Sequence, residues 1–410
     1  MNQMSSVPLH PPPVPGEVWF AGDRGEFRRL VTRGAALELI TFGFYRFWLA
    51  TDIRRHLWSN TVIEGNAAEY TGRGKELLFG FLFAIAIIMP IYLLYFLVGV
   101  EVERFKAFAS TPLFLFFYLF GQFAIYRARR YRLTRTVWCG VRFWMSGSGL
   151  AYAGRAALWG VLMALTLGLI LPWREAALER YKMRHSYYGD LQGSFEGTGW
   201  AFFKQGWWLW LLTAGPLLTL MVLPVLRFIP RLSSMSKGFT QASGLVVLLI
   251  LLMFPFIYGL FKAVEWRWWL SGIRFGDVRF ESSLLNGAVV GLYWKVIGWF
   301  LLIMVLFSAY LFGCAALIAG INHTPVAKLF TPANLQGSIP MLVMAVIGYL
   351  AFILTLNVVM RIYLLRDVWA RVIASTTVYG LEAAANVAAE GELANALGEG
   401  FADGLDVAGF

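Results

Sequence analysis

The residues best suited to chemistry are arginines interleaved with aromatic side chains between positions 126 and 142. Guanidinium groups bind phosphate through paired hydrogen bonds, and aromatic rings favour the boundary between lipid and water. The pattern predicts contact with an anion or with anionic phospholipid headgroups. The alternative is that these arginines only fix the topology by holding their loop in the cytoplasm. The candidate residues are Arg127, Arg129, Arg130, Arg132, Arg135 and Arg142, with Tyr126 and Trp138.

Polar residues inside apolar stretches form a second set of candidates, because a charge in lipid is costly and usually serves a function. Lys295 either binds an anionic substrate or extends to the headgroups. Asn357 either lines a polar path or forms a hydrogen bond between helices. Glu38 and Arg46 interrupt a weaker apolar stretch, and on one helix they would lie too far apart to pair. No chain of acidic residues suggests proton-coupled transport.

The sequence has no motif for other chemistry. It contains no phosphate-binding loop, nucleophile elbow or zinc-protease motif. The histidines and cysteines lack the spacing of metal ligands, and they are His10, His56, His185, His323, Cys139 and Cys314. The sequence therefore predicts no cofactor, no metal and no enzymatic activity.

The composition indicates a membrane protein. Of 410 residues, 59% are hydrophobic, 17% aromatic and only 14% charged, which excludes a soluble globular enzyme and a disordered chain. The net charge of +11 suits basic loops that face an anionic leaflet. Nucleic-acid binding has the same charge signature, but no soluble domain is present to carry it.

A membrane-spanning helix needs about 20 apolar residues. Candidate spans are Leu77–Val98, Leu113–Tyr126, Ala156–Leu171, Trp207–Val225, Leu245–Phe261, Ala288–Phe312 and Met341–Met360. Residues 31–58 form an eighth that either spans or lies in the interface. The expected fold is an all-α polytopic membrane protein of about eight transmembrane helices, with short repeated β-hairpins at the membrane surface.

The hairpins follow from a recurring pattern, in which an apolar helix leads into an Arg/aromatic cluster and then into strand and turn signals. Ile273/Phe275 and Val278/Phe280 alternate on either side of Gly276-Asp277, as in a two-residue hairpin. Tyr188-Gly189-Asp190-Leu191 repeats this signal. We expect the hairpins to associate, because a single one is marginally stable in water. The predicted units cover about 31–80, 113–160, 161–205, 245–290 and 341–378.

The two ends differ from the membrane domain predicted at 19–378. Residues 1–18 are Pro-rich, lack a signal peptide and predict a disordered arm. Residues 379–410 form an acidic tail with an Ala-rich part, 379–398, that favours a helix. The tail either stays in solvent or docks on the basic second unit by charge complementarity. Its acidic residues are Glu382, Glu390, Glu392, Glu399, Asp403 and Asp406, with no Lys or Arg.

Three stretches resemble the YjgN family of bacterial inner-membrane proteins, which carry a domain of unknown function. The resemblance is strong over about residues 25–200, although Cys139 stands where relatives have Arg. It implies a multi-pass inner-membrane protein and no particular activity. The stretches are Thr41–Trp48 with Arg54-Arg55, Leu57-Trp58, Asn60-Thr61 and Glu69–Gly72; Tyr126–Thr136 with Trp138, Gly140, Arg142 and Phe143; and Leu165–Leu169 with Pro172-Trp173 and Tyr188–Asp190.

The segment Ala156–Leu171 decides the topology. We expect a single crossing, which places the first two units opposite the last three; a re-entrant segment would put all five on one side. The internal repetition favours a transporter or channel for a small solute. The alternative is a lipid-interacting membrane scaffold without transport or catalysis. The partners expected are the lipid bilayer and its anionic phospholipid headgroups; protein partners are not indicated.

Overall fold

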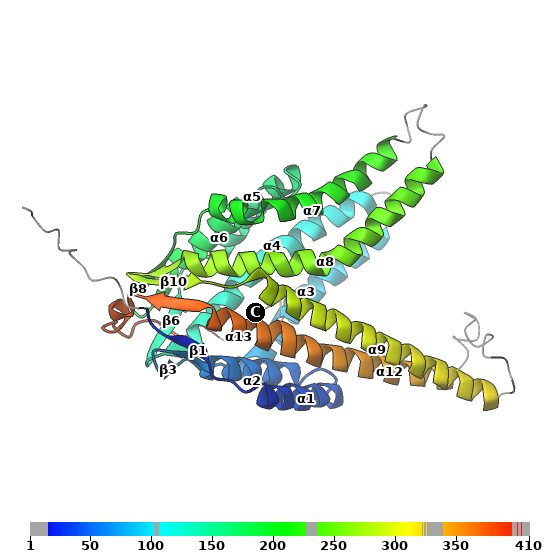
Figure 1. The fold of residues 1–410 in the computed structure, drawn as a ribbon, viewed down its shortest axis with the longest axis horizontal. Helices are drawn as coiled ribbons and strands as arrows, with labels where there is room; N and C mark the ends of the chain where they lie inside the picture. Colours follow the sequence, from blue (N-terminus) through cyan, green and yellow to red (C-terminus); the bar gives the residue numbers. More distant parts are fainter. Residues whose placement is uncertain are drawn as a thin grey trace, which may run out of the picture.

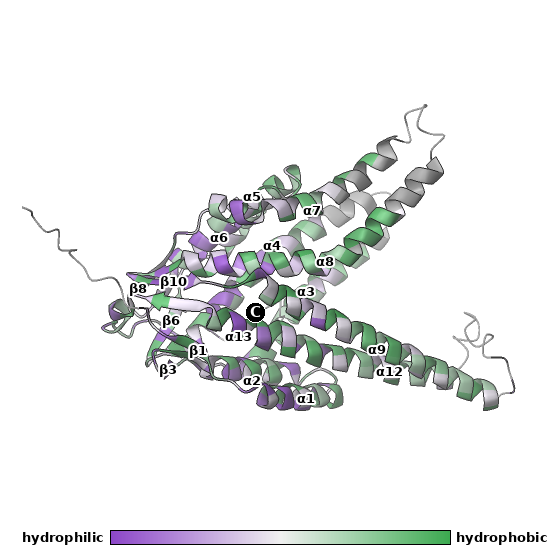
Figure 2. Ribbon diagram, in the orientation of Figure 1, coloured by the Kyte–Doolittle hydropathy of each residue, from purple (hydrophilic) through white to green (hydrophobic). Residues whose placement is uncertain are grey.

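The strands gather at one end of the molecule, and the long helices extend away from them (Figure 1). The computed structural model describes residues 15–101, 106–226, 236–321, 323, 325, 339–395, 400 and 403. We call the strand end the sheet side. In Figure 2 the long helices are mainly hydrophobic, whereas hydrophilic residues concentrate towards the sheet side.

Strands from the whole length of the chain meet in two sheets. An eight-stranded antiparallel sheet contains, in chain order, β4 (Glu69–Tyr70), β5 (Thr136–Trp138), β6 (Val141–Met145), β7 (Ser186–Tyr188), β8 (Leu191–Phe195), β9 (Ile273–Phe275), β10 (Val278–Ser282) and β11 (Thr376–Tyr379). A smaller sheet contains β1 (Val18–Phe20), β2 (Thr61–Ile63) and β3 (Asn66–Ala67). The expected association of the hairpins is confirmed. The all-α class is wrong, because the hairpins pair edge to edge into one sheet.

The two sheets are joined at both ends. The backbone N–H of Gly16 donates to the carbonyl of Val378 over 2.7 Å, which brings the segment before β1 against β11. At the other end only Ala68 separates β3 from β4. The strands thus form a ring, which protects their edges from pairing with other chains. Gly16 and Val18 fall within the arm predicted at 1–18, so that prediction extends too far; residues 1–14 lie outside the described residues.

Tight turns set the register of the hairpins. Gly189 and Gly276 adopt φ of 54° and 55°, so the Gly-Asp turns read from the sequence are present. A further turn has positive φ at two successive residues, Cys139 (48°) and Gly140 (78°), as a type I′ hairpin turn requires.

A hydroxyl side chain marks the junction from helix to strand in four places. Each hydroxyl belongs to the first residue of its strand and donates to a carbonyl four residues earlier. The bonds measure 2.7 to 2.9 Å and satisfy one of the carbonyls left free where a helix ends. The four residues are Thr61, Thr136, Ser186 and Thr376.

Two short helical hairpins alternate with the strands. One consists of α1 (Arg24–Ile40) and α2 (Arg46–Ser59), and the other of α5 (Gly149–Leu165) and α6 (Leu171–Arg184). We call their connections, Thr41–Tyr45 and Thr166–Ile170, the hairpin tips. In each tip a threonine hydroxyl caps the first helix, and the second and third residues have positive φ.

These hairpins overturn two expectations about the topology. β6 precedes α5 and β7 follows α6, yet the two strands pair, with Phe143 opposite Tyr188. The expected single span Ala156–Leu171 is therefore wrong as one helix, because the chain leaves the sheet in α5, turns at Thr166–Ile170 and returns in α6 to the neighbouring strand. Residues 31–58 likewise do not form one spanning helix, because they divide at Thr41–Tyr45 into α1 and α2.

Six long helices form three antiparallel pairs that extend from the sheet side. They are α3 (Gly74–Glu101) with α4 (Lys106–Thr134), α7 (Gly199–Leu226) with α8 (Ser236–Gly272), and α9 (Asn286–Ile321) with α12 (Ile339–Met360). A π-helical segment, η3 (Arg361–Asp367), and α13 (Val368–Ala374) lead α12 into β11.

Fewer helices than the expected eight qualify as membrane spans. Among the described residues, four helical stretches are long and apolar enough to cross a membrane. Of the four expected stretches that do not qualify, two belong to the short hairpins, and the other two, Leu113–Tyr126 and Trp207–Val225, lie in α4 and α7. The four that qualify are Gly74–Leu97, Gly244–Gly272, Asn286–Ile321 and Ile339–Ala374.

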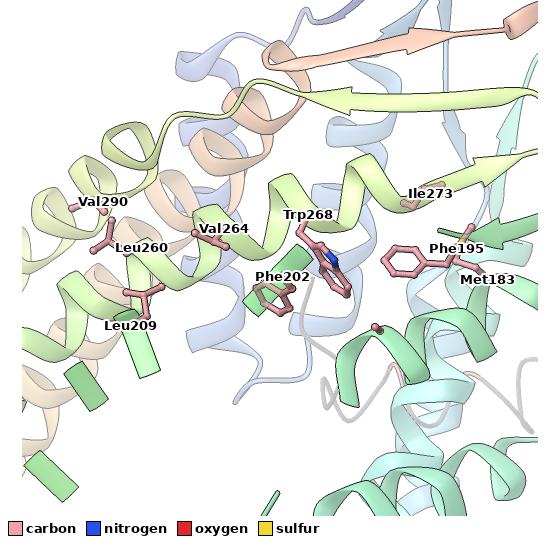
Figure 3. Close-up of a cluster of buried hydrophobic side chains, with 10 residues drawn as sticks. Met183, Phe195, Phe202, Leu209, Leu260, Val264, Trp268, Ile273 and Val290 are labelled. Atoms are coloured by element: carbon pink, nitrogen blue, oxygen red, sulfur yellow. The ribbon is translucent and has the colours of Figure 1, made fainter. Parts of the chain in front are cut away.

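An aromatic core anchors the pair α7 and α8 to the sheet (Figure 3). The Trp268 ring of α8 stacks on Phe202 of α7, with centroids 4.6 Å apart, and meets Phe195 of β8 edge-on at 5.0 Å. Its indole N–H donates to the Thr198 carbonyl over 3.0 Å, so the buried polar atom is satisfied. These contacts fix the direction in which α7 and α8 leave the sheet.

Gly199 allows the start of α7 to cross α6 closely. A Cβ at this position would lie 2.7 Å from Cα of Trp173, and the backbone there has no flexible end that can yield. We expect Gly199→Ala to destabilise the folded protein by about 1–3 kcal/mol, the usual cost of overpacking. Thermal unfolding in detergent measures this cost. Gly121→Ala, whose Cβ would meet nothing within 4 Å, is the control; equal stability of the two variants would contradict the prediction.

Candidate functional site

The arginines between positions 127 and 142, which the sequence offered as one anion site, contact separate partners around the end of α4. Arg129 pairs with Glu179 of α6 at 2.9 Å. Arg135 pairs with Glu76 of α3, also at 2.9 Å. Arg142 of β6 donates to the Thr134 carbonyl over 2.6 Å. The arginines therefore do not form one common anion site, and several join helices to one another.

The remaining members of the predicted set also have places in the fold. Arg127 lies over the ring of Phe123 at 5.2 Å, and Arg130 is half-buried. The Tyr126 hydroxyl donates to the Ser146 carbonyl. The Trp138 indole donates to the Asn66 carbonyl over 3.3 Å.

Glu179 is the centre of a buried charged cluster between α4 and α6. Its carboxylate pairs with Lys182 on the same helix as well as with Arg129. Burial alone would raise the pKa of Glu179, but the two cations outweigh that effect and lower it to about 2. The carboxylate is therefore ionised at neutral pH and holds α6 against α4.

A second buried ion pair joins α2 to the acidic tail. The guanidinium of Arg54 has two nitrogens on the carboxylate of Asp403, and both side chains are only 2% exposed. Nη1 of Arg54 also donates to the Tyr70 hydroxyl over 3.3 Å. Nε of Arg132 lies 3.6 Å from Asp403. Arginines from two helices thus converge on one carboxylate, and Arg54 also bonds to a tyrosine of β4.

The tail reaches this place along the sheet. After β11 the chain forms a short 3-10 helix, η4 (Leu381–Ala384), and the longer helix that its alanines favour does not form over the described part of that segment, up to residue 395. The N–H of Ala388 then donates to Asp190 in the turn between β7 and β8. Farther on, the Ala394 carbonyl accepts from Arg135 over 3.3 Å. The tail thus contacts the basic second unit through Arg135 and Arg132, whereas its buried carboxylate, Asp403, pairs most closely with Arg54 of the first unit.

The four polar candidates in apolar stretches are not brought together. Glu38 of α1 accepts two hydrogen bonds from Arg361 at 2.9 and 3.2 Å, which tie the first hairpin to the end of α12. The Arg46 guanidinium lies 4.5 Å from the ring centre of Phe81. Lys295 is exposed on α9, and Asn357 is half-buried in α12. The structure thus shows a connecting role for Glu38.

An apolar crevice of about 310 Å³ opens beside the tip of the second hairpin. Leu167 and Pro172 line it from the hairpin, Gly206 and Trp210 from α7, and Phe254 from α8. The Trp210 indole donates to the Leu167 carbonyl over 3.1 Å and holds the tip against α7. The walls of the crevice therefore offer almost only hydrocarbon and aromatic surface.

A second apolar pocket, of about 270 Å³, lies within the ring of strands. Aromatic side chains from seven different segments line it, and they are Trp58, Trp138, Phe143, Tyr188, Phe275, Phe280 and Trp369. The indoles of Trp58 and Trp369 stack with centroids 5.0 Å apart and donate to the Thr136 and Thr61 hydroxyls. Because these polar atoms are satisfied by one another, the pocket is lined by apolar surface.

Sequence reasoning missed the acidic partners Glu76 and Glu179, and it did not single out Asp403 among the acids of the tail. An available signal was that the chain has few acids, so each one among many arginines was a candidate partner. The hairpin tips were also missed, although Thr41-Phe42-Gly43 and Thr166-Leu167-Gly168 share a Thr-apolar-Gly pattern typical of a helix end.

Comparison with known proteins identifies a family. No group of three or more His, Cys, Asp or Glu side chains among the described residues is placed to hold a metal ion. No curated protein and no solved structure matches the chain. Residues 15–404 match a family described as bacterial protein of unknown function (DUF898). The match covers nearly the whole sequence, so this chain belongs to that bacterial family, the YjgN type that its sequence resembles.

Proposed function

We propose that this protein is a multi-pass protein of the bacterial inner membrane that binds phospholipid beside a helical hairpin that enters the membrane. In this arrangement the six long helices cross the bilayer as three pairs. The ring of strands lies on the cytoplasmic side, where the positive-inside rule places the seven arginines between 127 and 155. In this arrangement the helical segments that connect the hairpins are repeats of one helix–hairpin unit.

The exposed hairpin tips support entry into the lipid. Phe42 is 94% exposed and Leu165 is 76% exposed, although both are large apolar residues. Exposed apolar side chains grouped at a protruding turn are typical of a surface that contacts membrane. Arg46, directly after the first tip, is placed to reach the headgroups as the tip enters the acyl region.

The crevice beside the second tip is the observation that carries the proposal. α8, which forms one of its walls, includes a helical stretch long and apolar enough to cross a membrane, and α7 packs along α8. A crevice with apolar walls that opens between such helices fits an acyl chain better than a polar solute. The exposed fractions of Trp207 (49%) and Phe254 (58%) indicate that it opens sideways, towards the lipid.

Filling the crevice tests the proposal. Gly206 lines it, and a Cβ there would meet only ordinary contacts at 3.9 Å, so Gly206→Leu is expected to fold. Its side chain would displace two or three methylenes of a bound chain. We expect phospholipid binding to weaken by about 2 kcal/mol, roughly thirty-fold. Native mass spectrometry of the purified protein with added phosphatidylglycerol measures this change.

Gly298→Leu on α9 is the matched control, because its Cβ meets nothing within 4 Å and it lies outside the crevice. Retention of the same lipid by wild type and both variants would refute the proposal. Transport of a small solute, the other function expected from the sequence, has no contact in its favour among the described residues. Lys295 and Asn357, on which it rests, lie on different helices, with Lys295 exposed.

A further inference from the structure

The aromatic pocket within the ring of strands has the size of a ligand site. Side chains in a packed core normally leave few gaps larger than one water molecule. This pocket measures about 270 Å³, close to the volume of roughly 300 Å³ at which small-molecule pockets begin. The aromatic side chains around it therefore leave room for a small molecule between them. We call it the strand pocket.

Hydrogen bonds hold two of its aromatic walls in place. The Trp58 indole donates to the Thr136 hydroxyl, and the Trp369 indole donates to the Thr61 hydroxyl, each over 3.0 Å. Each hydroxyl in turn donates to a carbonyl near the end of the helix that precedes its strand. Walls that are already fixed lose little conformational freedom when a ligand binds, and this favours binding.

The lining selects against charge. The Tyr188 hydroxyl, another polar group in the wall, donates to the Trp138 carbonyl over 3.0 Å. Apart from this tyrosine and the two threonines, the lining side chains are aliphatic, phenylalanine or tryptophan. A charged ligand would lose its hydration here without gaining equivalent hydrogen bonds, which is costly. The strand pocket therefore favours a neutral, apolar ligand.

The angles between the walls favour an aromatic ligand over a saturated chain. The ring of Phe143 is inclined by 41° to Tyr188 at 4.7 Å, and by 74° to Phe275 at 5.9 Å between centroids. Walls inclined in this way offer both the faces and the edges of aromatic rings, which attract each other. An aromatic ligand gains these contacts in addition to the burial of its apolar surface, whereas a saturated chain gains the burial alone.

The position of the strand pocket separates it from lipid. Its strands belong to the sheet side, where hydrophilic residues concentrate, and the long apolar helices extend away from it (Figure 2). Leu381 and Ala384 of η4 line it from the tail, and the segment after β11 lies beyond the strands in Figure 1, on the side away from the helices. A ligand that dissolves in water suits this position better than a phospholipid whose chains stay in the bilayer.

We propose that the strand pocket binds a small, neutral aromatic molecule from the aqueous phase, with Trp58, Phe143 and Trp369 among its contacts. The residues that form it come from helices, strands and the tail, so the site exists only when the ring of strands has assembled. It shares no lining residue with the apolar crevice between the second hairpin, α7 and α8. This proposal therefore does not depend on phospholipid binding in the crevice.

Filling the strand pocket from η4 tests this proposal. Ala384→Phe would place an aromatic side chain in the space that the ligand requires. Ala385→Phe is the matched control, because Ala385 is exposed and does not line the pocket. In full-length protein in nanodiscs, we expect Ala384→Phe to bind naphthol at least tenfold more weakly than wild type. Ala385→Phe and the crevice variant Gly206→Leu should bind it as wild type does. Equilibrium dialysis with labelled naphthol, corrected for uptake by empty nanodiscs, measures all four proteins.

Octanol, which is also neutral but saturated, tests the preference for aromatic ligands. We expect wild type to bind it at least fivefold more weakly than naphthol. The melting temperature of each variant without ligand shows whether it is folded. If Ala384→Phe is not, Ala68→Phe fills the same pocket from between β3 and β4. The proposal is overturned if wild type shows no saturable binding of naphthol, if a folded filling variant binds it as wild type does, or if octanol binds as tightly.

Discussion

Glu179→Gln should be among the most destabilising single substitutions in this protein. The neutral amide would leave Lys182 and Arg129 facing each other with no negative charge between them. Breaking a buried ion pair by removing one partner costs about 3–5 kcal/mol, because the remaining charge stays desolvated. We expect a comparable loss in the free energy of unfolding, measured by denaturant or thermal titration in detergent.

Glu196→Gln provides the control for this prediction. Glu196 also pairs with an arginine, Arg274, at 3.0 Å, but its side chain is 65% exposed. An exposed pair contributes about 0–1 kcal/mol. Similar destabilisation by the two substitutions would show that burial of the cluster does not determine its strength.

The ion pairs of Glu179 should also make the stability of the wild-type protein depend on pH. The folded state lowers the pKa of Glu179 from the ordinary 4.5 to about 2. A carboxyl with a lowered pKa stabilises the fold above its unfolded pKa, and this contribution is lost as the pH falls through the folded value. The stabilisation should therefore be complete above about pH 4.5 and decline towards pH 2, and this part of the decline should be absent from Glu179→Gln.

Thiol labelling should place the second and third units on the same side of the membrane. The expected effect is large, because each cysteine either reacts with an impermeant reagent in intact cells or is protected from it. Cys139 is exposed in the turn between β5 and β6, and Asp190 is exposed in the next hairpin. In a background with Cys314→Ser, we expect Cys139 to resist a membrane-impermeant maleimide in intact cells. A cysteine at position 190, with Cys139→Ser, should be protected equally. Both should react once the cells are opened.

A site at the opposite end of the long helices completes this test. Ile321 ends α9 and is exposed, so Ile321→Cys in the background without native cysteines should react in intact cells. Opposite labelling of positions 139 and 190 would mean that α5 and α6 cross the membrane once. It would contradict the pairing of β6 with β7.

Local patterns in the sequence predicted the hairpins but not the way the chain returns between them. Gly189 and Gly276 lie in the turns that their neighbours indicate, because a two-residue turn needs positive φ and only a few residue types supply it. Ala156–Leu171 has the apolar content of a span, yet it divides at Leu167 and Gly168. Composition does not distinguish one long helix from two short ones, since the difference lies in a single helix end.

The candidate site was less accessible to prediction than the fold. The arginines were evident, but their partners are far away in sequence, as with Arg54 and Asp403. The pairing of each acidic residue with a particular arginine depends on how α2, α4 and the tail pack. No short-range pattern in the sequence specifies this packing. Net charge offered contact of the tail with the second unit as one of two alternatives, because electrostatic attraction acts without detailed geometry, but it did not indicate that Asp403 pairs with Arg54.

The joining of Gly16 to Val378 makes closure of the ring the last step in pairing the strands. Strands that are neighbours in the sheet are also neighbours along the chain, so each hairpin pairs with one already synthesised as translation proceeds. The bridge to Gly16 must wait until the last helix is in place, because Val378 follows it. A molecule with one helical pair wrongly inserted keeps its ring open and exposes unpaired strand edges, which proteases and chaperones recognise.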